Sequence, residues 1–276
     1  MDPWPHASDL QQLYKQDNIF SVNRKTFAIA NTPTFPEKVY RRYGSDDRFI
    51  VKTCMKLSRN QSSRRVLDVG CSTGRLLSAF HMYDGNLELH GIDIDPGAKD
   101  LAPEWLHDNV IIGNFLEHDF VHKFDIITMK FVIEHLTNPN AFIERASKLL
   151  NKNGVLFIST PDIASPKARL QSVNWHSLNE PNIKTGHILW FNRDSLMHLG
   201  QRAGLDIMHC TNRGELIYHL PAPVRSILFH IFGKTPAGHF INANTLRLLY
   251  ASLFDGVLSE KLDYGDSLYA FFSLSR

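Results

Sequence analysis

The feature that most constrains the fold of this chain is an apolar run that leads directly into a glycine turn. The segment RVLDVGCSTGRLL places a strand-like run at 65–69 before Gly70 and Gly74, and a helical stretch follows at about 74–82. A glycine turn at such a junction lets the backbone approach a ligand closely, while the first amides of the helix face that ligand. The segment therefore predicts a nucleotide-like ligand at the end of a buried strand.

The alternation of strand and helix continues along the chain. Short apolar runs, which are the sequence form of parallel strands covered on both faces, alternate with helical stretches. The expected strands are 65–69, 87–93, 110–112, 124–129 and 155–159, and the expected helices between them are 74–82, 97–101 and 139–150. A further helix, which Asp194 can cap and Gly204 can end, precedes two final strands at 206–210 and 268–274. The pattern predicts an α/β fold with a doubly wound sheet.

Two segments outside this alternation are also expected to be helical. Residues 1–60 contain a helix-like stretch at 37–57 and are interpreted as a helical N-terminal extension to a domain at 61–276. Residues from about 211 to 267 are rich in aliphatic and aromatic side chains, with glycine and proline turns between them. This helical insertion before the last strand could cover the sheet edge, form a lid over an acceptor, or contact a membrane surface or a lipid-linked substrate.

Composition narrows the class of protein. The 276 residues carry 30 basic and 28 acidic side chains, a net charge of +2, which gives nucleic-acid binding no support. The three cysteines lack a CxxC or Cys/His pattern, which favours a reducing, cytoplasmic compartment over a disulfide framework. No segment reaches the roughly 18 apolar residues needed to cross a bilayer. We therefore expect a protein that is soluble or at most peripheral to a membrane, and the sequence says nothing firm about its oligomeric state.

The glycine spacing separates two classes of ligand. A dinucleotide fingerprint requires glycines where this chain has Gly70, Ser72 and Arg75, so two of the three positions fail. The shorter pattern DxGxxxG, formed by Asp68, Gly70 and Gly74, fits a ligand whose amino-acid end lies over the loop. The spacing favours this second class of ligand.

An acid follows at the end of the second expected strand. In GIDID, Asp93 lies some 19 positions after Gly74, where a carboxylate can accept hydrogen bonds from both hydroxyls of a ribose. An acid that caps a short strand would stand there for structural reasons alone. The turn and the acid together favour a nucleoside ligand.

The segments that carry these features resemble a known family. The chain contains, in order, VLDVGCSTG, GIDID, VIIGNFLE, FDIITMKFVIEHL and LLNKNGVLFISTP. These segments look like the successive motifs of class I S-adenosylmethionine-dependent methyltransferases over about residues 64–161. FVIEHL and STPD are most similar to the branch of quinone-biosynthesis O-methyltransferases, bacterial glycan and lipid methyltransferases, and small-RNA 2′-O-methyltransferases. The resemblance implies a Rossmann-like sheet of seven mostly parallel strands, the last one antiparallel, with S-adenosylmethionine across the ends of the first strands.

The resemblance also implies a set of cofactor contacts. Asp68, Gly70, Cys71 and Gly74 would hold the methionine part, Asp93 the ribose, and Asn114 and Phe115 the adenine, while Ile94 and Lys130 complete the set. Ser72 departs from the usual middle glycine, and its small side chain fits if its φ is negative. Asn114 stands where the family usually has an aspartate. It can accept a hydrogen bond from adenine through its carbonyl, or it can stabilise its own turn.

Two histidines are candidates for the chemistry. Methyl transfer displaces a sulfonium that is already activated, so the main task of such an enzyme is positioning. A hydroxyl acceptor still gains from a group that takes its proton, and histidine suits neutral pH. His135, after the fourth strand, is the first candidate base, and His187 is the second. The alternative is that Glu134 and His135 cap or brace the helix that follows.

The resemblance raises the question of a metal. In the small-RNA and some quinone methyltransferases, the matching segment binds a divalent metal through two glutamates, a histidine and a further histidine downstream. Here Phe131 stands at the first glutamate position, while Glu134, His135 and His187 remain. Because one carboxylate is missing, the site for a hard cation is incomplete, and no metal is expected.

Aromatic side chains follow the fifth strand, where an acceptor would be held. They could stack on a sugar, a quinone or a base, or they could belong to the core. The apolar texture of ILWF favours the core role for Trp190, whereas Trp175 is expected to face an acceptor.

The sequence favours a cytoplasmic methyltransferase that acts on an oxygen of a small or lipid-linked metabolite, such as a quinone or a sugar. One alternative is a non-catalytic, methyltransferase-like binding module, in view of the departures at Ser72, Asn114 and Phe131. An RNA methyltransferase that uses basic pairs such as Arg64–Arg65 is less favoured, because scattered pairs are usually solvated. The third alternative is a dinucleotide-dependent oxidoreductase.

Overall fold

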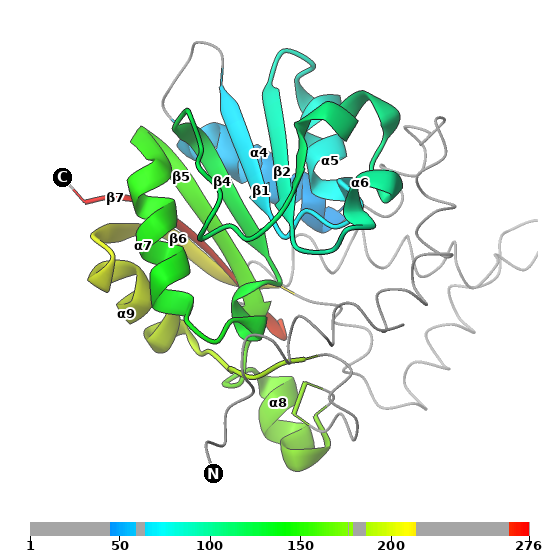
Figure 1. Ribbon diagram of the computed structural model, residues 1–276. Coiled ribbons are helices and arrows are strands. Elements are labelled where there is room, and N and C mark those ends of the chain that lie inside the picture. The colour runs from blue at the N-terminus through cyan, green and yellow to red at the C-terminus, as the bar shows by residue number, and fades with distance from the viewer. Residues whose placement is uncertain (1–44, 59–63, 176, 179–185, 214–264, 276) are drawn as a thin grey trace, which may run out of the picture.

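A seven-stranded sheet forms the centre of the fold in the computed structural model (Figure 1). The structure describes residues 45–58, 64–175, 177–178, 186–213 and 265–275. The strand order is β3-β2-β1-β4-β5-β7-β6, and β7 runs antiparallel to β5 and to β6 while the other pairs are parallel. The predicted fold, a doubly wound sheet with an antiparallel last strand, is confirmed.

The strands lie close to where the apolar runs predicted them. They are β1 Arg65–Val69, β2 Glu88–Asp93, β3 Val110–Ile112, β4 Phe124–Lys130, β5 Leu150–Pro161, β6 Leu205–Arg213 and β7 Ser267–Leu274. The largest difference is β5, which begins five residues before the expected start at 155. Leu150 already pairs with Phe124, and the register then shifts before Val155 pairs with Ile126. The strand β6 also runs on to Arg213, past the expected end at 210.

Helices and short 3-10 turns connect the strands. They are α4 Ser45–Leu57, α5 Arg75–Tyr83, α6 Ala98–Leu101, η1 Glu104–Asn109, η2 Ile133–His135, α7 Pro139–Leu149, α8 Pro166–Gln171, η3 Ser172–Asn174 and α9 Arg193–Arg202. The expected helix at 37–57 is therefore described only from Ser45, and the expected helical insertion falls largely on 214–264, outside the described residues. Among the residues that the structure describes, no helix has the length and apolar content to span a bilayer. The proposed division into domains at 1–60 and 61–276 stays a prediction.

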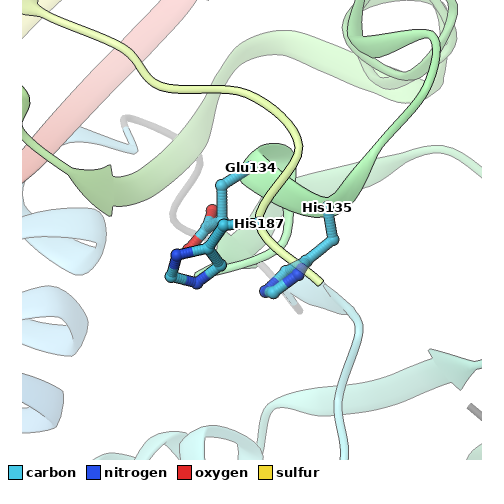
Figure 2. A group of neighbouring side chains, drawn as sticks. All are labelled: Glu134, His135 and His187. Carbon is cyan, nitrogen blue, oxygen red and sulfur yellow. The ribbon is translucent and has the colours of Figure 1, made fainter. Parts of the chain in front are cut away.

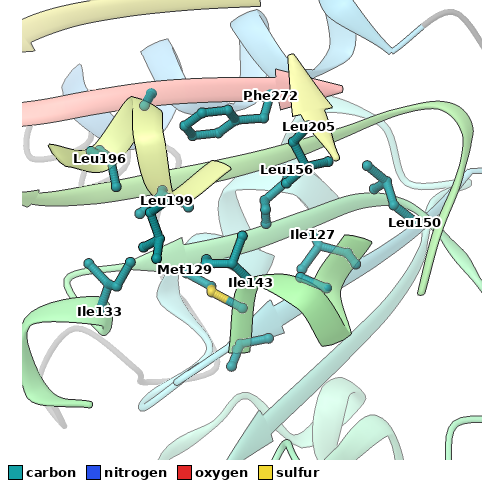
Figure 3. Close-up of a cluster of buried hydrophobic side chains, with 14 of the residues drawn as sticks. Ile127, Met129, Ile133, Ile143, Leu150, Leu156, Leu196, Leu199, Leu205 and Phe272 are labelled. Carbon is teal, nitrogen blue, oxygen red and sulfur yellow. The ribbon is translucent and has the colours of Figure 1, made fainter. Parts of the chain in front are cut away.

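Each face of the sheet packs into its own apolar core. On one face, α7 and α9 pack against residues such as Ile127, Met129 and Leu156 (Figures 1 and 3). On the other face, α4 and α5 pack against residues such as Val66 and Ile126 (Figure 1). Neighbouring residues in a strand point to opposite faces, so a strand covered on both sides is apolar at every position. This is why continuous apolar runs, rather than alternating ones, predict these strands.

The helix ends show how local side chains set the boundaries. The helix α9 is capped by Asn192, whose side-chain oxygen accepts from the Ser195 N–H at 2.8 Å, while the Ser195 hydroxyl lies 2.9 Å from the Asn192 N–H. The expected cap at Asp194 is wrong, because Asp194 lies inside the first turn of the helix. Gly204 has a φ of +73° just past the end of α9, which agrees with its expected role.

The parallel strands end at one edge of the sheet and place the loops of interest there. Val69, Asp93 and Lys130 are the last residues of β1, β2 and β4. Because these strands are parallel and adjacent, the loops that follow them meet at the carboxyl edge, where ligands of open α/β sheets bind.

Candidate active site

A cavity of about 310 Å³ lies at the carboxyl edge of the sheet. The loops after β1, β2, β3 and β4 all contribute to its wall. Its lining includes Gly70, Ser72, Asp93, Ile94, Asp95, Leu101, Asn114, Phe115, Leu116, Phe131, Val132, His135 and Phe142. The cavity therefore joins residues that lie up to 73 positions apart in the sequence, from Val69 to Phe142.

The glycine turn after β1 packs tightly against neighbouring side chains. Gly70 has a φ of +74°, and its N–H donates to the Ile92 carbonyl at 2.8 Å. A Cβ on Gly70 would lie 2.6 Å from Cγ2 of Val132, and a Cβ on Gly74 would lie 2.8 Å from Cδ2 of Leu106. Both glycines are therefore required by conformation and by space.

Ser72 has a left-handed backbone conformation instead of the expected negative φ. Its φ is +48°, in the left-handed region, so the condition of a negative φ is not met. The strain of such a conformation costs about 1–2 kcal/mol for a residue with a Cβ. The Ser72 N–H donates to the Asp93 carboxylate at 2.7 Å, and this bond helps to hold the turn against the end of β2.

Asp93, the residue expected to bind the ribose, lies in the cavity wall. Its other carboxylate oxygen accepts from the Asp95 N–H at 2.9 Å. Burial raises the pKa of the Asp93 carboxyl, although the N–H groups of Asp95 and Ser72 lower it in part. Each carboxylate oxygen has a second acceptor site, so Asp93 can also accept from hydroxyls of a ligand.

Asn114 and Phe115 form the part of the wall after β3. The Asn114 side-chain oxygen accepts from the Leu116 N–H at 2.9 Å, and its amide donates to Glu117 at 2.7 Å. The alternative that Asn114 stabilises its own turn is therefore the arrangement seen here. Phe115 is buried, and its ring centroid lies 5.5 Å from that of Phe142, a residue of α7 that the sequence argument missed.

Four predicted cofactor residues lie behind the cavity wall rather than in it. These residues, which do not belong to the cavity lining, are Asp68, Cys71, Gly74 and Lys130. The Cys71 sulfur fills the space beside Gly91, where a Cβ would lie 2.7 Å from it. The Asp68 carboxylate accepts from the Thr128 hydroxyl at 2.6 Å, and burial raises the pKa of this carboxyl to about 7. These four residues would affect a bound ligand indirectly, through the shape of the glycine turn and the electric charge behind it.

Glu134, His135 and His187 form a compact group beside the cavity (Figure 2). Each offers one ligand atom, and these atoms lie within 4.8 Å of one another. The Glu134 carbonyl accepts from the N–H groups of Ile188 and Leu189 at 2.9 and 3.1 Å, and these bonds hold the segment of His187 against η2. The structure thus brings together the two predicted bases, of which only His135 lines the cavity.

The environment of Glu134 is unusual for a carboxylate. The residue is 1% exposed, and neither side-chain oxygen makes a hydrogen bond within the described part of the chain. Burial raises the pKa of the Glu134 carboxyl to about 8, an effect that its own backbone and the neighbouring Thr160 hydroxyl only partly offset. The alternative that Glu134 and His135 cap the next helix is wrong in its capping part, because α7 is capped by Asn138.

The donor set of this group fits a divalent cation. One carboxylate and two imidazoles are sufficient for three protein ligands of a zinc or iron site. His135 Nδ1 lies 3.1 Å from the Gly186 carbonyl, which fixes the ring and directs Nε2 to any ligand. The expectation from the sequence that the chain uses no metal stays a prediction.

Trp175 and Trp190, the tryptophans that follow β5, show the opposite burial to the one expected. Trp175 is fully buried, whereas Trp190 is 37% exposed, and its indole N–H donates to the Ser177 carbonyl at 2.8 Å.

Phe131, which follows β4 and lines the cavity, has a φ of +54°, and its N–H donates to the Ser159 carbonyl at 3.0 Å. No sequence signal pointed to this conformation, because Phe rarely adopts it.

Comparison with known proteins identifies the family. A family model described as a methyltransferase domain matches residues 40–210. The ubiquinone biosynthesis O-methyltransferase of Rhodopseudomonas palustris strain TIE-1 is 32% identical over 123 residues, which cover 39% of this chain and 46% of that protein. The chain therefore spans less than half the length of this curated relative.

Solved structures share the fold at low sequence identity. The plantazolicin methyltransferase BpumL, in complex with S-adenosylhomocysteine, has a TM-score of 0.54 at 15% identity, over 97% of this chain and 94% of that one. Coclaurine N-methyltransferase has a TM-score of 0.52 at 13% identity, over 82% of this chain and 72% of that one. At such identities the likeness concerns the fold alone.

The fold and the cavity at its carboxyl edge define a Rossmann-like nucleoside-binding protein of the methyltransferase type. The chain belongs to the S-adenosylmethionine-dependent methyltransferase domain family, whose model covers more than half of it. The family uses S-adenosylmethionine as its cofactor. The acceptor, and which side chains take part in the reaction, are not fixed by family membership.

Proposed function

We propose that this chain transfers a methyl group from S-adenosylmethionine to an oxygen of a small molecule. The observation that carries the proposal is the cavity whose lining contains both Asp93 and His135. A carboxylate such as that of Asp93 can accept hydrogen bonds from the ribose of a nucleoside cofactor. An imidazole such as that of His135 can take the proton of a hydroxyl acceptor. The name of the relative from R. palustris supports oxygen as the accepting atom.

The cofactor would lie along the cavity from the glycine turn to α7. Its ribose hydroxyls would donate to Asp93, and its adenine would pack among the apolar side chains of Leu101, Phe115 and Phe142. The side-chain oxygen of Asn114 keeps a second acceptor site for the adenine amino group, although the Leu116 N–H occupies the first.

His135 would act as the base. S-adenosylmethionine would supply an activated methyl group: the acceptor oxygen would form a bond to the methyl carbon, and the electrons of the carbon–sulfur bond would stay on sulfur, which would yield S-adenosylhomocysteine. The proton of the acceptor hydroxyl passes to Nε2 of His135, because Nδ1 faces the Gly186 carbonyl and would carry its own proton. His187 lies beside this ring, with 4.8 Å between the ring centroids, and would support the same step.

A divalent cation is a second candidate element of the site. The buried Glu134 carboxylate, which makes no hydrogen bond within the described residues, favours it. In this alternative, His135 would be a ligand rather than the base: Glu134, His135 and His187 would hold the cation, which would lower the pKa of an acceptor hydroxyl. Dialysis against EDTA followed by metal analysis and thermal melting tests this element. An unchanged melting temperature and no bound metal would exclude it.

Replacement of His135 by Ala tests the proposed function. We expect kcat to fall by about 10²-fold, because general base catalysis contributes on this order. The affinity for S-adenosylhomocysteine should change less than twofold. His122→Ala, at an exposed position, is the matched control and should leave both quantities unchanged. An unchanged kcat in His135→Ala would contradict the role of this residue.

The choice of acceptor needs its own assay. We expect turnover with hydroxylated aromatic acceptors, with or without a short lipid chain, and none with amines of similar size. Binding of S-adenosylhomocysteine without turnover on any hydroxyl, amine or RNA acceptor would instead favour a non-catalytic module. Stabilisation by NAD rather than by S-adenosylhomocysteine would favour an oxidoreductase.

A further inference from the structure

The lining of the cavity follows the order of the strands. In the sheet, β3, β2, β1 and β4 are neighbours in that order. The ends of these strands and the loops after them provide, in the same order, Asn114, Asp93, Gly70 and Phe131 to the lining. The cavity therefore runs from a β3 end, at Asn114, to a β4 end, at Phe131, with Asp93 between them.

This order sets the direction of a bound nucleoside. In the function proposed above, Asp93 holds the ribose, and the adenine packs at the β3 end against Phe115 and Phe142. In such a cofactor the base is attached to C1′ of the ribose, whereas the carbon that carries the sulfur is attached to C4′, on the other side of the ring oxygen. The sulfur would therefore lie toward the β4 end.

The sulfur of S-adenosylmethionine carries a positive charge, and a cation in a mostly apolar cavity needs a partner. Among the described residues that line the cavity, the acids are Asp93 and Asp95, both at the end of β2. The phenyl rings are those of Phe115 and Phe142 at the β3 end and that of Phe131 at the β4 end. The partner that the lining offers to a sulfonium at the β4 end is thus the ring of Phe131.

The structure holds Phe131 in place at a cost in backbone strain. Its φ of +54° lies in the left-handed region, which a phenylalanine rarely adopts. Its N–H donates to the Ser159 carbonyl at 3.0 Å and to the Ser159 hydroxyl oxygen at 3.2 Å, and Ser159 is fully buried in β5. Its ring centroid lies 6.5 Å from that of Tyr269, with the two rings nearly perpendicular. Strain of this kind persists where the surroundings fix it, and it is common at functional sites.

We propose, on the basis of the function proposed above, that the ring of Phe131 recognises the positive charge of the sulfonium. A cation over the face of a phenyl ring is attracted by the quadrupole of the ring. S-adenosylhomocysteine has lost both the methyl group and the charge, so it lacks this attraction. Phe131 would therefore favour the cofactor over the product and would help the exchange of one for the other after each turnover.

A comparison of ligands that differ in charge tests this role. S-adenosylmethionine and S-adenosylhomocysteine share the nucleoside and the amino-acid end. Isothermal titration of Phe131→Leu without an acceptor should show that affinity for S-adenosylmethionine falls about fivefold more than affinity for S-adenosylhomocysteine, on the scale of a partly exposed cation–π contact. Sinefungin, which carries an amine in place of the sulfonium methyl group, should lose affinity as S-adenosylmethionine does, because its amine is protonated at neutral pH.

Three further variants make the test specific. Phe142→Leu removes the same ring at the β3 end, and it should weaken S-adenosylmethionine and S-adenosylhomocysteine by the same factor, because both carry the adenine. Phe131→Tyr keeps a ring and should leave the ratio of the two affinities within about twofold of the wild type. If Phe131→Leu does not fold, Phe131→Gly removes the ring and relieves the strain of the positive φ, and it should show the same difference between the ligands.

The outcomes distinguish this inference from the proposed function. Equal losses for both ligands in Phe131→Leu, no loss for either, or a change of the ratio in Phe131→Tyr as large as that in Phe131→Leu would each overturn the role of Phe131. A loss for sinefungin that follows S-adenosylhomocysteine would overturn it too, because contact with the methyl group rather than charge would then be recognised. A changed ratio in Phe142→Leu would place the sulfonium at the β3 end, with the same consequence. A wild-type protein that binds none of these ligands would instead refute the proposed function.

Discussion

At the scale of single residues, the site combines strain with buried charge. Ser72 and Phe131 both have a positive φ without being glycine, and both line the cavity. Such conformations persist where the surrounding structure determines them, and they are common at functional sites. The sequence showed the departure from glycine at position 72 but not the conformation, because φ there is set by the bond to Asp93 across the turn.

Replacement of Ser72 by Gly should raise the free energy of unfolding by up to about 1 kcal/mol. The strain energy that this change removes from the folded state is larger than the free-energy cost of the extra chain entropy that glycine gives the unfolded state. Denaturant titration measures the change. The control Ser78→Gly, inside α5, should lower the free energy of unfolding by about 1 kcal/mol. Equal destabilisation by both variants would show that Ser72 is not strained.

The pKa of Asp68 gives a pH dependence with a defined sign. Its folded-state value of about 7 lies above the ordinary 3.8, so Asp68 favours folding of the ligand-free chain at low pH, and this contribution is lost as the pH rises from about 4 to 7. An ionised Asp68 places a negative charge behind the glycine turn, which would favour the ammonium group of the ligand, so affinity for S-adenosylhomocysteine should rise as the pH passes 7. Titrations at pH 6 and 8.5 should show this rise in the wild type and a smaller one in Asp68→Asn. Equal rises would contradict it.

At the scale of elements, the strands were predictable and the helix ends were less so. An apolar run buried on both faces has few alternatives to a central strand, and β1 and β3 begin and end where the sequence placed them. At α9, Asn192 and Asp194 are both good capping residues, and the sequence alone cannot rank them. The structure selects Asn192 because its partner Ser195 completes a capping box.

The capping box predicts a difference between these two residues. Asn192→Ala should lower the free energy of unfolding by about 1 kcal/mol, because it leaves a helix N–H without its acceptor. Asp194→Ala loses only a favourable interaction with the helix dipole and should cost about half as much or less. Thermal melts compare the two. A larger effect at Asp194 would restore the original prediction.

At the scale of the whole molecule, the site depends on contacts that cross the chain. The sequence provided the glycine turn, Asp93 and His135, since each follows a recognisable strand. It could not show that residues 188 and 189 bind the Glu134 carbonyl, which brings His187 to His135, because the contact joins loops some 50 residues apart. The reversal of Trp175 and Trp190 has the same cause: burial is set by how the loop after β5 returns to the sheet.

The central claim is that the cavity at the carboxyl edge binds the nucleoside of S-adenosylmethionine through Asp93. Isothermal titration of the wild type and of Asp93→Ala with S-adenosylhomocysteine tests it most directly. We predict one site in the wild type and at least about tenfold weaker binding in the variant, because two charge-assisted hydrogen bonds to the ribose are lost. Equal affinity in both proteins, or no binding by the wild type, would contradict the claim.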